Sequence, residues 1–278
     1  MRKAVQDDTR NPMTAEPDVL TSARSTSGVQ SLGRAFAILE VMADAGGIIG
    51  LSELAERADL PLATIHRLVR TLVDLGYVRQ EPSRQYSLGS RLIRLADMSS
   101  KRIATWARPA MNGAVAELGE SVNLAVLDGD EIVYVAQVQP STNFMRMFTE
   151  VGRRTSPHST AVGKAILSQR SDDEVTDLLD RTGMARHTDS TLTTPQGFLT
   201  ELVDVRTRGF AIDEGEQERG VRCVAVVVPS APQPMALSMS GPLTRVDDGV
   251  VERAAIVLHA AAAEIAAELN RIRTPRDV

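Results

Sequence analysis

The sequence has a single cysteine and no long apolar run, and both absences restrict what the protein can be. Cys223 alone cannot form an intrachain disulfide or a cysteine-based zinc site. No stretch approaches the roughly 20 uninterrupted apolar residues that a membrane helix needs. Residues 1–19 carry acids and prolines where a signal peptide has an apolar core. We therefore expect a cytoplasmic protein with no membrane partner.

The motifs of common enzyme and nucleotide-binding classes are also missing. The chain has no Walker A sequence, dinucleotide fingerprint, H-E-x-x-H motif or G-x-S-x-G elbow. His158, Ser159 and Asp213 could form a nominal triad, but adjacent residues rarely bring their side chains within hydrogen-bonding distance of each other. His158, Asp213 and Cys223 lack the local spacing of metal ligands. We predict no catalytic residue, cofactor or metal, with a hydrolase using His158 and Ser159 as an alternative.

The first part of the chain changes from a polar segment to short helical patterns. Residues 1–27 have few large apolar residues and no sustained period, and we expect a disordered tail there. A helix is predicted over 32–45, which Gly46 and Gly47 end. Its expected apolar stripe has residues three or four apart, namely Leu32, Ala35, Phe36, Leu39 and Met42.

Two short helices joined by a brief turn follow, which is the spacing of a helix-turn-helix. Ser52 is a suitable N-cap for the first, and Pro61 is the expected first residue of the second, which runs to about residue 75. Short strands over 77–79 and 85–88 can then pair around a turn, and this hairpin is the predicted wing. A connecting helix is expected from residue 90 to residue 100.

The second of these helices has an apolar face and a polar face, as a recognition helix requires. The apolar face consists of Ile65, Leu68, Val69, Leu72 and Leu75. On the polar face, an arginine can bind guanine bidentately or hold a phosphate. The predicted DNA contacts are Thr64, His66, Arg67, Arg70, Arg79 and Arg84. The alternative is a solvated face with ordinary surface arginines, and the net charge of −5 does not decide between them, because DNA binding needs only a local basic face.

From about residue 105 helical and strand patterns mix, which predicts an α+β domain. Asp128-Gly129-Asp130 is a strong hairpin turn between strands over 122–127 and 131–138. Further strands are expected over 144–148, 210–213, 221–228 and 235–240. Helices are expected over 159–168, 172–181, 195–209 and 247–272, the second capped by Ser171. No period of 20–50 residues repeats, which argues against a solenoid.

Several separated motifs resemble the IclR family of bacterial regulators. The N-terminal motifs are SLGRAFAILEVMADAG, LSELAERADLPLATIHRLVRTLVDLGYV and YSLG. The C-terminal motifs are PHSTAVGKAIL, RGFAIDEGEQERGVRCVAVVV and ALSMSGP. The resemblance covers roughly residues 28–272. The chain departs from it at Leu62 and Ala63, where the family often has a basic residue and a serine.

The resemblance implies a winged helix-turn-helix joined by a linker helix to a GAF-like α/β effector-binding domain. The boundaries that we expect are a tail over 1–27, the DNA-binding domain over 28–89, the linker over 90–104, the effector domain over 105–273 and a tail over 274–278. The implied partners are double-stranded operator DNA, an organic or aromatic acid, and further copies of the chain in a dimer or dimer of dimers. Repression is the more expected outcome.

By motif position, the resemblance implies an effector site in the C-terminal domain. Its expected residues are Met145, Met147, Ala161, Val162, Asp213, Cys223, Ser238 and Ser240. Small residues at 161–163 would let a carboxylate approach backbone N–H groups at a helix N-terminus, and Ser238 and Ser240 share one face of a strand. Cys223 and the methionines could instead be plain core, and Asp213 could only hold its loop. A C-terminal domain that merely dimerises an architectural DNA-binding protein is the remaining alternative.

Overall fold

A computed structural model of the protein describes residues 29–141 and 149–273. The chain divides into two compact units, Met1–Asp97 and Met98–Val278. Helix α4 (Arg91–Trp106) begins in the first unit and continues into the second. None of the described helices combines the length and the apolar content needed to cross a bilayer.

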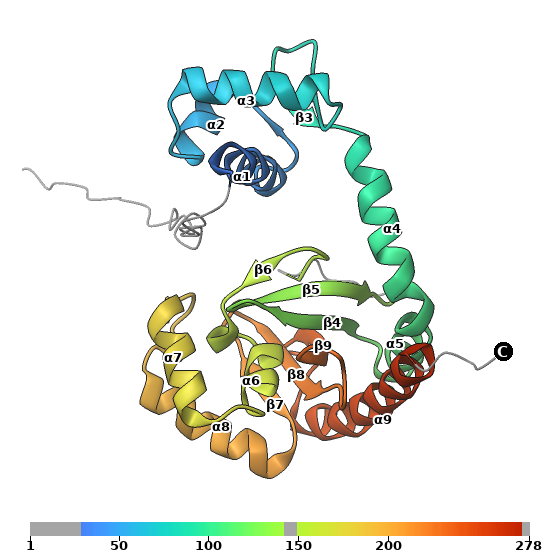
Figure 1. The fold of residues 1–278 in the computed structure, drawn as a ribbon. Helices are drawn as coiled ribbons and strands as arrows, with labels where there is room; N and C mark the ends of the chain where they lie inside the picture. The colour runs from blue at the N-terminus through green and yellow to red at the C-terminus, as the bar shows by residue number, and fades with distance from the viewer. Residues whose placement is uncertain (1–28, 142–148, 274–278) are drawn as a thin grey trace, which may run out of the picture. The chain divides into compact units, whose positions relative to one another are not determined.

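The N-terminal unit packs three helices against a small antiparallel sheet (Figure 1). Its helices are α1 (Gln30–Asp44), α2 (Leu51–Arg57) and α3 (Leu62–Asp74). Its strands lie in the order β1 (Ile48–Ile49), β3 (Tyr86–Leu88) and β2 (Val78–Gln80). The predicted helix-turn-helix is α2 and α3, and the predicted wing is the β2–β3 hairpin. Strand β1 was not predicted, because two residues are too short for a pattern.

Several local predictions in this unit are wrong. Gly50 rather than Ser52 is the N-cap of α2, and no side chain caps that helix. Pro61 is the N-cap of α3 rather than its first residue. In α1 the buried residues are Ile38, Val41 and Met42, whereas Leu32 and Phe36 are 58% and 59% exposed. The predicted stripe is therefore right at Met42, which is buried, and at Ala35 and Leu39, which pack against the core, and it is wrong at Leu32 and Phe36, because α1 is apolar on both faces.

The predicted apolar face of α3 is correct except at its end. Ile65, Val69 and Leu72 are buried in the core of the unit, with Leu68 partly buried against it. Leu75 is exposed, since it is the C-cap residue and α3 has already ended at Asp74. The polar face of this helix is thereby left to solvent.

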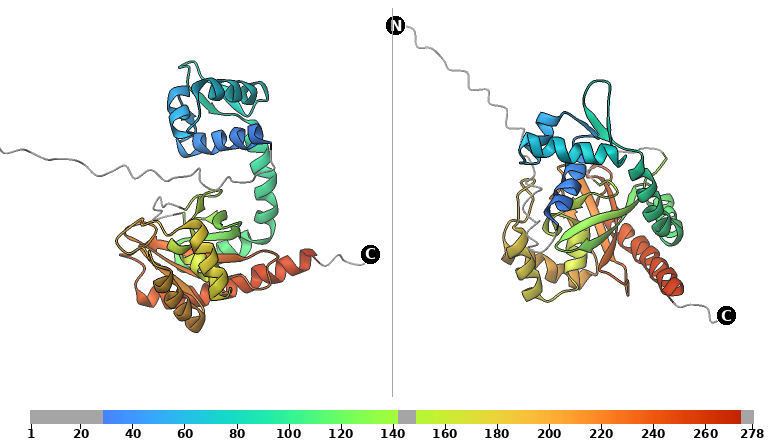
Figure 2. Two further views of the ribbon diagram at one scale, coloured as in Figure 1. Left: turned by 60° about the vertical axis from the view of Figure 1, so that its left-hand side comes forward. Right: turned by 45° about the horizontal axis from the view of Figure 1, so that its top comes forward.

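The C-terminal unit is built on a six-stranded antiparallel sheet of order β6-β5-β4-β9-β8-β7 (Figures 1 and 2). In chain order the strands are β4 (Ser121–Asp128), β5 (Glu131–Val138), β6 (Arg154–Thr155), β7 (Ala211–Glu214), β8 (Val221–Val227) and β9 (Met235–Pro242). The α-helices of this unit are α5 (Arg108–Leu118), α6 (Ala161–Leu167), α7 (Asp172–Thr182), α8 (Pro195–Arg208) and α9 (Asp248–Arg273). A short 3-10 helix, η1 (Pro157–Ser159), precedes α6.

Each face of this sheet has its own hydrophobic core, because successive side chains of a strand point to opposite faces. One core joins α5 and α9 to residues such as Leu124, Val224 and Leu237. The other joins α6, α7 and α8 to residues such as Ala125, Ala225 and Ala236. Leu124 and Ala125 are neighbours on β4, Val224 and Ala225 on β8, and Ala236 and Leu237 on β9. Neighbouring residues of one strand therefore belong to different cores.

The strong local signals in this unit are confirmed. Asp128 pairs with Glu131 around the predicted hairpin turn, and Gly129 has the positive φ of such a turn. Ser171 forms a capping box at the start of α7, and Pro195 and Gly209 bound α8 as expected. Helix α5 and strand β6 were not predicted. The strand expected over 144–148 lies outside the described residues.

The helix expected over 159–168 differs at its start, where η1 and a cap at Thr160 precede α6. Gly163 explains why this junction is tight. A Cβ at residue 163 would lie 2.0 Å from the carbonyl oxygen of Pro157, far closer than atoms approach without moving. Only glycine lets α6 lie directly against η1, and this contact brings Thr160 and Ala161 over the sheet.

Candidate functional site

The polar face of α3 carries the side chains that were predicted to contact DNA. His66, Arg67 and Arg70 are exposed, and Thr64 is partly exposed near the start of the helix. Ile65 and Val69 hold the opposite face in the core. The helix therefore presents two guanidinium groups to solvent from a fixed backbone, which is the arrangement that base or phosphate contacts require.

The two arginines of the wing differ in their surroundings. Arg79 donates two hydrogen bonds to the Glu81 carboxylate, the shorter at 2.7 Å. Ser87 also donates to this carboxylate at 2.6 Å, and the bonds from Ser87 and Arg79 lower the pKa of Glu81. Arg84 is exposed at the hairpin turn with a φ of +64°. The charge of Arg79 is thus partly balanced within the wing, and that of Arg84 lies at its tip.

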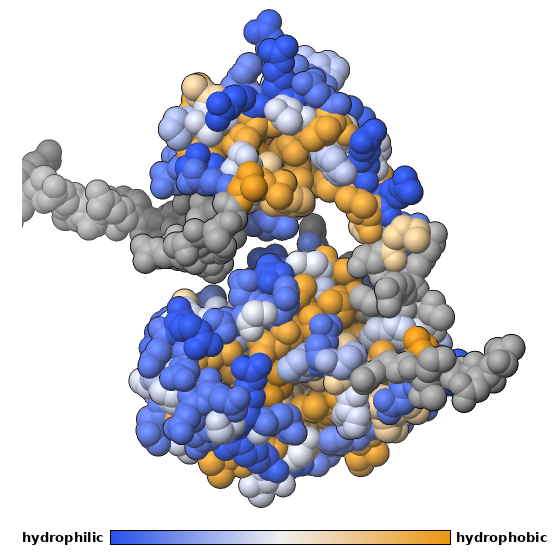
Figure 3. All heavy atoms as spheres, in the orientation of Figure 1, coloured by the Kyte–Doolittle hydropathy of each residue, from blue (hydrophilic) through white to orange (hydrophobic). Residues whose placement is uncertain are grey.

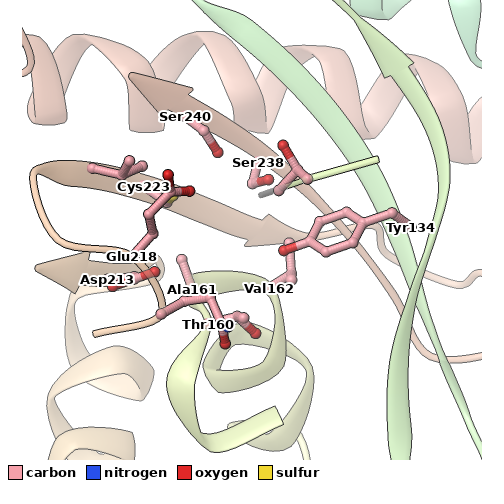
Figure 4. A pocket seen from close by; sticks show the side chains of 12 residues that line it. Tyr134, Thr160, Ala161, Val162, Asp213, Glu218, Cys223, Ser238 and Ser240 are labelled. Atoms are coloured by element: carbon pink, nitrogen blue, oxygen red, sulfur yellow. The ribbon is translucent and has the colours of Figure 1, made fainter. Parts of the chain in front are cut away.

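A second candidate site is a cavity in the C-terminal unit, between the sheet and the start of α6 (Figure 4). Its volume is about 20 Å³, which is room for one or two water molecules. The lining residues come from four strands, from α6 with its cap, from the segment after β7 and, at Thr149, from the segment before β6. They are Tyr134, Thr149, Thr160, Ala161, Val162, Asp213, Gln217, Glu218, Val221, Cys223, Ser238 and Ser240.

The strand register explains why residues distant in the sequence meet in this cavity. Asp213 on β7 is paired with Cys223 on β8, and Cys223 is paired with Ser240 on β9. Asn123 on β4 is paired with Ser238, and its amide donates to the Ser240 hydroxyl over 3.2 Å. All these residues lie on the face of the sheet that α6 covers. Small and polar side chains there leave a space that larger apolar ones would fill.

Six of the eight residues predicted for the effector site line this cavity together: Ala161, Val162, Asp213, Cys223, Ser238 and Ser240. Met145 and Met147 lie outside the described residues. The prediction missed several lining residues. Tyr134 was identifiable in principle, because it lies two residues after Ile132 and therefore on the same face of a predicted strand. Gln217 and Glu218 lie inside the motif RGFAIDEGEQERGVRCVAVVV, but nothing in that motif distinguishes them from neighbouring loop residues that do not line the cavity.

A buried ion pair holds the segment after β7 beneath the cavity. The Lys164 ammonium, only 2% exposed, donates to the Glu216 carboxylate and, over 2.9 Å, to the carbonyl of Ile212. Thr188 and Thr191 donate to the carbonyls of Gly215 and Glu216, each over 2.7 Å. These bonds fix the backbone from which Asp213 and Glu218 reach the cavity.

Three groups of the cavity wall, Asp213, Tyr134 and Cys223, are shifted toward their neutral forms. Burial, together with the nearby Glu216 charge, raises the pKa of Asp213 to about 7 against the opposing effects of backbone N–H bonds and Lys164. Burial likewise raises the pKa of the Tyr134 hydroxyl and of the Cys223 thiol well above their usual values. Cys223 is therefore a neutral thiol and not a reactive thiolate.

The nominal Ser-His-Asp triad is not assembled. The His158 ring donates through Nε2 to the Ala185 carbonyl over 3.0 Å, and the Ser159 hydroxyl donates to the Gln217 side chain over 2.6 Å. Asp213 accepts from the backbone N–H of Glu216 over 2.6 Å. The three side chains thus have separate partners. Within residues 29–141 and 149–273, no group of three or more acidic, histidine or cysteine side chains could hold a metal ion.

Family models match both units of the chain. A model described as "IclR helix-turn-helix domain" matches residues 31–82, and one described as "Bacterial transcriptional regulator IclR C-terminal" matches residues 96–267. The transcriptional repressor IclR of Escherichia coli is 37% identical over 254 residues, which cover 88% of this chain and 92% of that protein.

Solved structures of similar chains share this architecture. An IclR transcriptional regulator from Alicyclobacillus acidocaldarius has a TM-score of 0.77 at 27% identity, covering 87% of this chain and 99% of that one. An IclR homologue from Microbacterium hydrocarbonoxydans, solved in complex with 4-hydroxybenzoate, has a TM-score of 0.73 at 24% identity, covering 87% and 99%. At this identity the second structure supports the fold alone.

Proposed function

The chain belongs to the IclR family and is a DNA-binding transcription regulator rather than an enzyme, and we propose that it is a repressor whose operator affinity is set by a small organic or aromatic acid. The proposal also includes the cytoplasmic location and the domain boundaries expected above. The observation that carries it is the polar cavity, because six residues expected from motif position converge on one space beside the start of α6. A domain that only dimerised would not need a buried polar space there.

The DNA-binding part of the proposal rests on α3. We propose that Arg67 and Arg70 enter the major groove with Thr64 and His66, and that Arg79 and Arg84 of the wing bind phosphates. Leu62 is exposed in the first turn of α3, and it supplies no polar group to DNA. The specificity of this helix therefore depends chiefly on its two arginines.

Dimerisation is supported by apolar side chains on the surface of the N-terminal unit, one face of which is shown in Figure 3. Leu32 and Phe36 of α1 are exposed, as are Ile93 and Leu95 of α4. Leu32 and Phe36, four residues apart, share one face of α1, and an exposed apolar face of this kind is typical of a protein–protein interface. We propose that a second copy of the chain covers them, which would present two α3 helices to a palindromic operator.

The effector part rests on the chemistry of the cavity wall. Hydroxyl groups from Tyr134, Thr160 and Ser240 and the first backbone N–H groups of α6 can donate to a carboxylate. The similar structure that holds 4-hydroxybenzoate is consistent with an acid of this kind. A cavity of about 20 Å³ is smaller than such a molecule, so binding must move the wall. This movement would give the ligand different affinities for two arrangements of the dimer, typically by about 1–3 kcal/mol.

The first experiment is fluorescence anisotropy of the full chain on labelled DNA from upstream of its own gene and on a scrambled duplex. Specific binding that weakens steeply with salt is expected. Arg67→Ala should lose about 1–3 kcal/mol and relax specificity at one operator position. Equal weakening on every duplex would make Arg67 a phosphate contact. Equal affinity of the native chain for both duplexes would oppose a specific site in this DNA.

Carboxylic acids are then titrated into the operator complex. Release or tightening of the DNA by an acid distinguishes a sensor from an architectural protein, which would not respond. Ser240→Leu should abolish the response while operator binding persists, because residue 240 lines the cavity in the C-terminal unit. Thr200→Ala, an exposed change on α8, is the matched control and should respond normally. Loss of both functions in Ser240→Leu would indicate misfolding and contradict separate sites.

A further inference from the structure

The described part of the cavity wall contains carboxyl groups but no cation. Of its twelve lining side chains, those of Asp213 and Glu218 are carboxyls, and none belongs to lysine, arginine or histidine. Figure 4 shows both carboxyls at one end of the cavity and the Tyr134 ring at the other. An ionised acid that enters this space meets like charge, with only hydroxyls and backbone N–H groups from these residues to hold it.

Asp213 is the more deeply buried of these two carboxyls, at 3% exposure. The backbone N–H of Glu216 donates to its Oδ1 over 2.6 Å, and the backbone N–H of Gln217 also bonds to this carboxyl. Lys164 is the nearby cation, but its ammonium donates to the Glu216 carboxylate and the Ile212 carbonyl. Within the described residues, Asp213 forms no salt bridge that would hold it ionised.

Every element packed around Asp213 contributes a charged or titratable group. These groups are Lys164 on α6, Glu216 and Glu218 after β7, Cys223 on β8 and Tyr134 on β5. The Cys223 thiol and the Tyr134 hydroxyl stay neutral at physiological pH, because burial raises the pKa of each. Lys164 and Glu216 balance each other's charge. The environment therefore adds little positive potential to stabilise an ionised Asp213.

We propose that Asp213 is protonated whenever an organic acid occupies the cavity, and that its O–H donates a hydrogen bond to the carboxylate of that acid. This inference rests on the proposed effector function. The ionised Asp213 gains one proton from solvent, no covalent bond of the ligand changes, and the bound pair holds one negative charge in place of two. Two carboxyl groups in contact share a proton in this way because like charges at such a distance cannot both ionise.

The way in which affinity for the acid changes with pH follows from this proton uptake by Asp213. Asp213, with a pKa of about 7 in the free protein, already holds its proton below neutrality, so affinity for the acid stays constant there. Above pH 7 the proton must be taken up on binding, and affinity falls by up to about tenfold for each further pH unit. A typical carboxylic effector, with a pKa near that of free aspartate, about 4, stays ionised throughout.

The test is isothermal titration calorimetry of the full chain with acetate, lactate, benzoate and 4-hydroxybenzoate. Titrations at pH 6, 7 and 8, each in two buffers of different ionisation enthalpy, give affinity and the number of protons exchanged. For an acid that binds, uptake should approach one proton at pH 8. Its affinity should fall about tenfold between pH 6 and pH 8.

Two variants test whether Asp213 or Glu218 takes up the proton. Asp213→Asn keeps an oxygen for the Glu216 N–H and places an amide donor where the O–H would be. It should bind the acid without proton uptake and with the same affinity at pH 6 and pH 8. Glu218→Gln removes the other wall carboxyl and should keep the proton uptake and the tenfold change.

The outcomes distinguish proton uptake by Asp213 from the proposed acid-sensing function on which it rests. Acid binding with no proton uptake, or uptake that persists in Asp213→Asn, overturns the inference and leaves the acid sensor in place. Failure of all four acids to bind overturns the acid-sensing function and the inference with it. Uptake that disappears in Glu218→Gln but not in Asp213→Asn moves the proton to Glu218 and contradicts the assignment.

Discussion

The two faces of the six-stranded sheet are made by alternate residues of the same strands, yet they differ in chemistry. The face under α5 and α9 is lined mainly by large aliphatic side chains such as Leu124, Val224 and Leu237, which form a continuous apolar core. The face under α6 places Asn123, Ser238 and other polar residues in the interior. The first face stabilises the domain through close packing, and the second gives up part of its packing for a polar cavity.

The helices that cover the two faces differ as well. One face is covered mainly by α9, a single helix of 26 residues. The other is covered by three shorter helices, each of which begins at a side-chain cap, namely Thr160, Ser171 and Thr194. Short helices gain little from propensity alone and depend on caps and tertiary contacts. The cavity face should therefore be held together by specific polar contacts, and the α9 face by apolar area.

Lys164→Met tests the strongest polar contact of the cavity face. Removing the ammonium leaves the Glu216 carboxylate buried without its cation, which should lower the free energy of unfolding by about 3–5 kcal/mol. Urea denaturation followed by circular dichroism measures this loss. The double variant Lys164→Met, Glu216→Gln also removes the unpaired buried carboxylate, and it should recover much of the lost free energy of unfolding. A double variant no more stable than the single one would contradict the explanation.

Adjacent residues of β9 compare the two faces directly. Leu237→Ala should lower the free energy of unfolding by about 2–5 kcal/mol, because it opens a hole under α9. Ser238→Ala removes a single hydroxyl and should lower it by about 1 kcal/mol or less, while changing the response to an effector acid. Denaturant midpoints of both variants provide the measurement. Similar losses at the two positions would show that the faces contribute alike.

Asp213 makes the cavity face sensitive to pH. Its pKa of about 7 when folded exceeds the value of about 3.9 expected when unfolded. Between these values only the folded state keeps the proton, so its contribution to the free energy of unfolding should fall by about 1 kcal/mol per pH unit as pH rises. Denaturation of Asp213→Asn and of the native chain at pH 5 and pH 7 isolates this contribution. Parallel pH profiles for the two proteins would refute it.

Ser171→Ala should produce the smallest of these effects. It removes the hydroxyl that accepts from the Glu174 N–H, while the backbone N–H of residue 171 can still donate to the Glu174 carboxylate, and it should lower the free energy of unfolding by about 1 kcal/mol. Thr200→Ala is the matched control, because Thr200 is exposed on α8 and caps no helix. Thermal denaturation of the pair should show a lower midpoint for Ser171→Ala alone. Equal midpoints would mean that α7 does not depend on its cap.

Much of the fold could be predicted because a few neighbouring residues determine where many of its helices begin and where its chain turns. Asp128-Gly129-Asp130, the Ser171 cap and Pro195 each determine a turn or a helix start from a few neighbouring residues. The burial of α1 was predicted correctly at Met42 but not at Leu32 and Phe36, because both faces of the helix are apolar and only tertiary packing selects the one with Ile38 and Val41.

The cavity could be predicted only where a motif marked it. Ala161 and Ser240 lie on a helix or strand within their motifs, whereas Gln217, although inside a motif, reaches the cavity through the fold of a loop and a bond from Ser159. The pairing of Cys223 with both Asp213 and Ser240 depends on strand register across the sheet. Such long-range contacts follow from the whole domain rather than from any segment of it.

The alternation along β9 also bears on how the specificity of this regulator can diverge. Ser238 and Ser240 face the cavity, while Leu237 and Met239 face the α9 core. Positions 238 and 240 can thus be varied together in a library while Leu237 and Met239 are kept. If the proposed acid sensing holds, substitutions at these two positions would change the ligand without altering the α9 core, which makes this strand a starting point for engineering a biosensor.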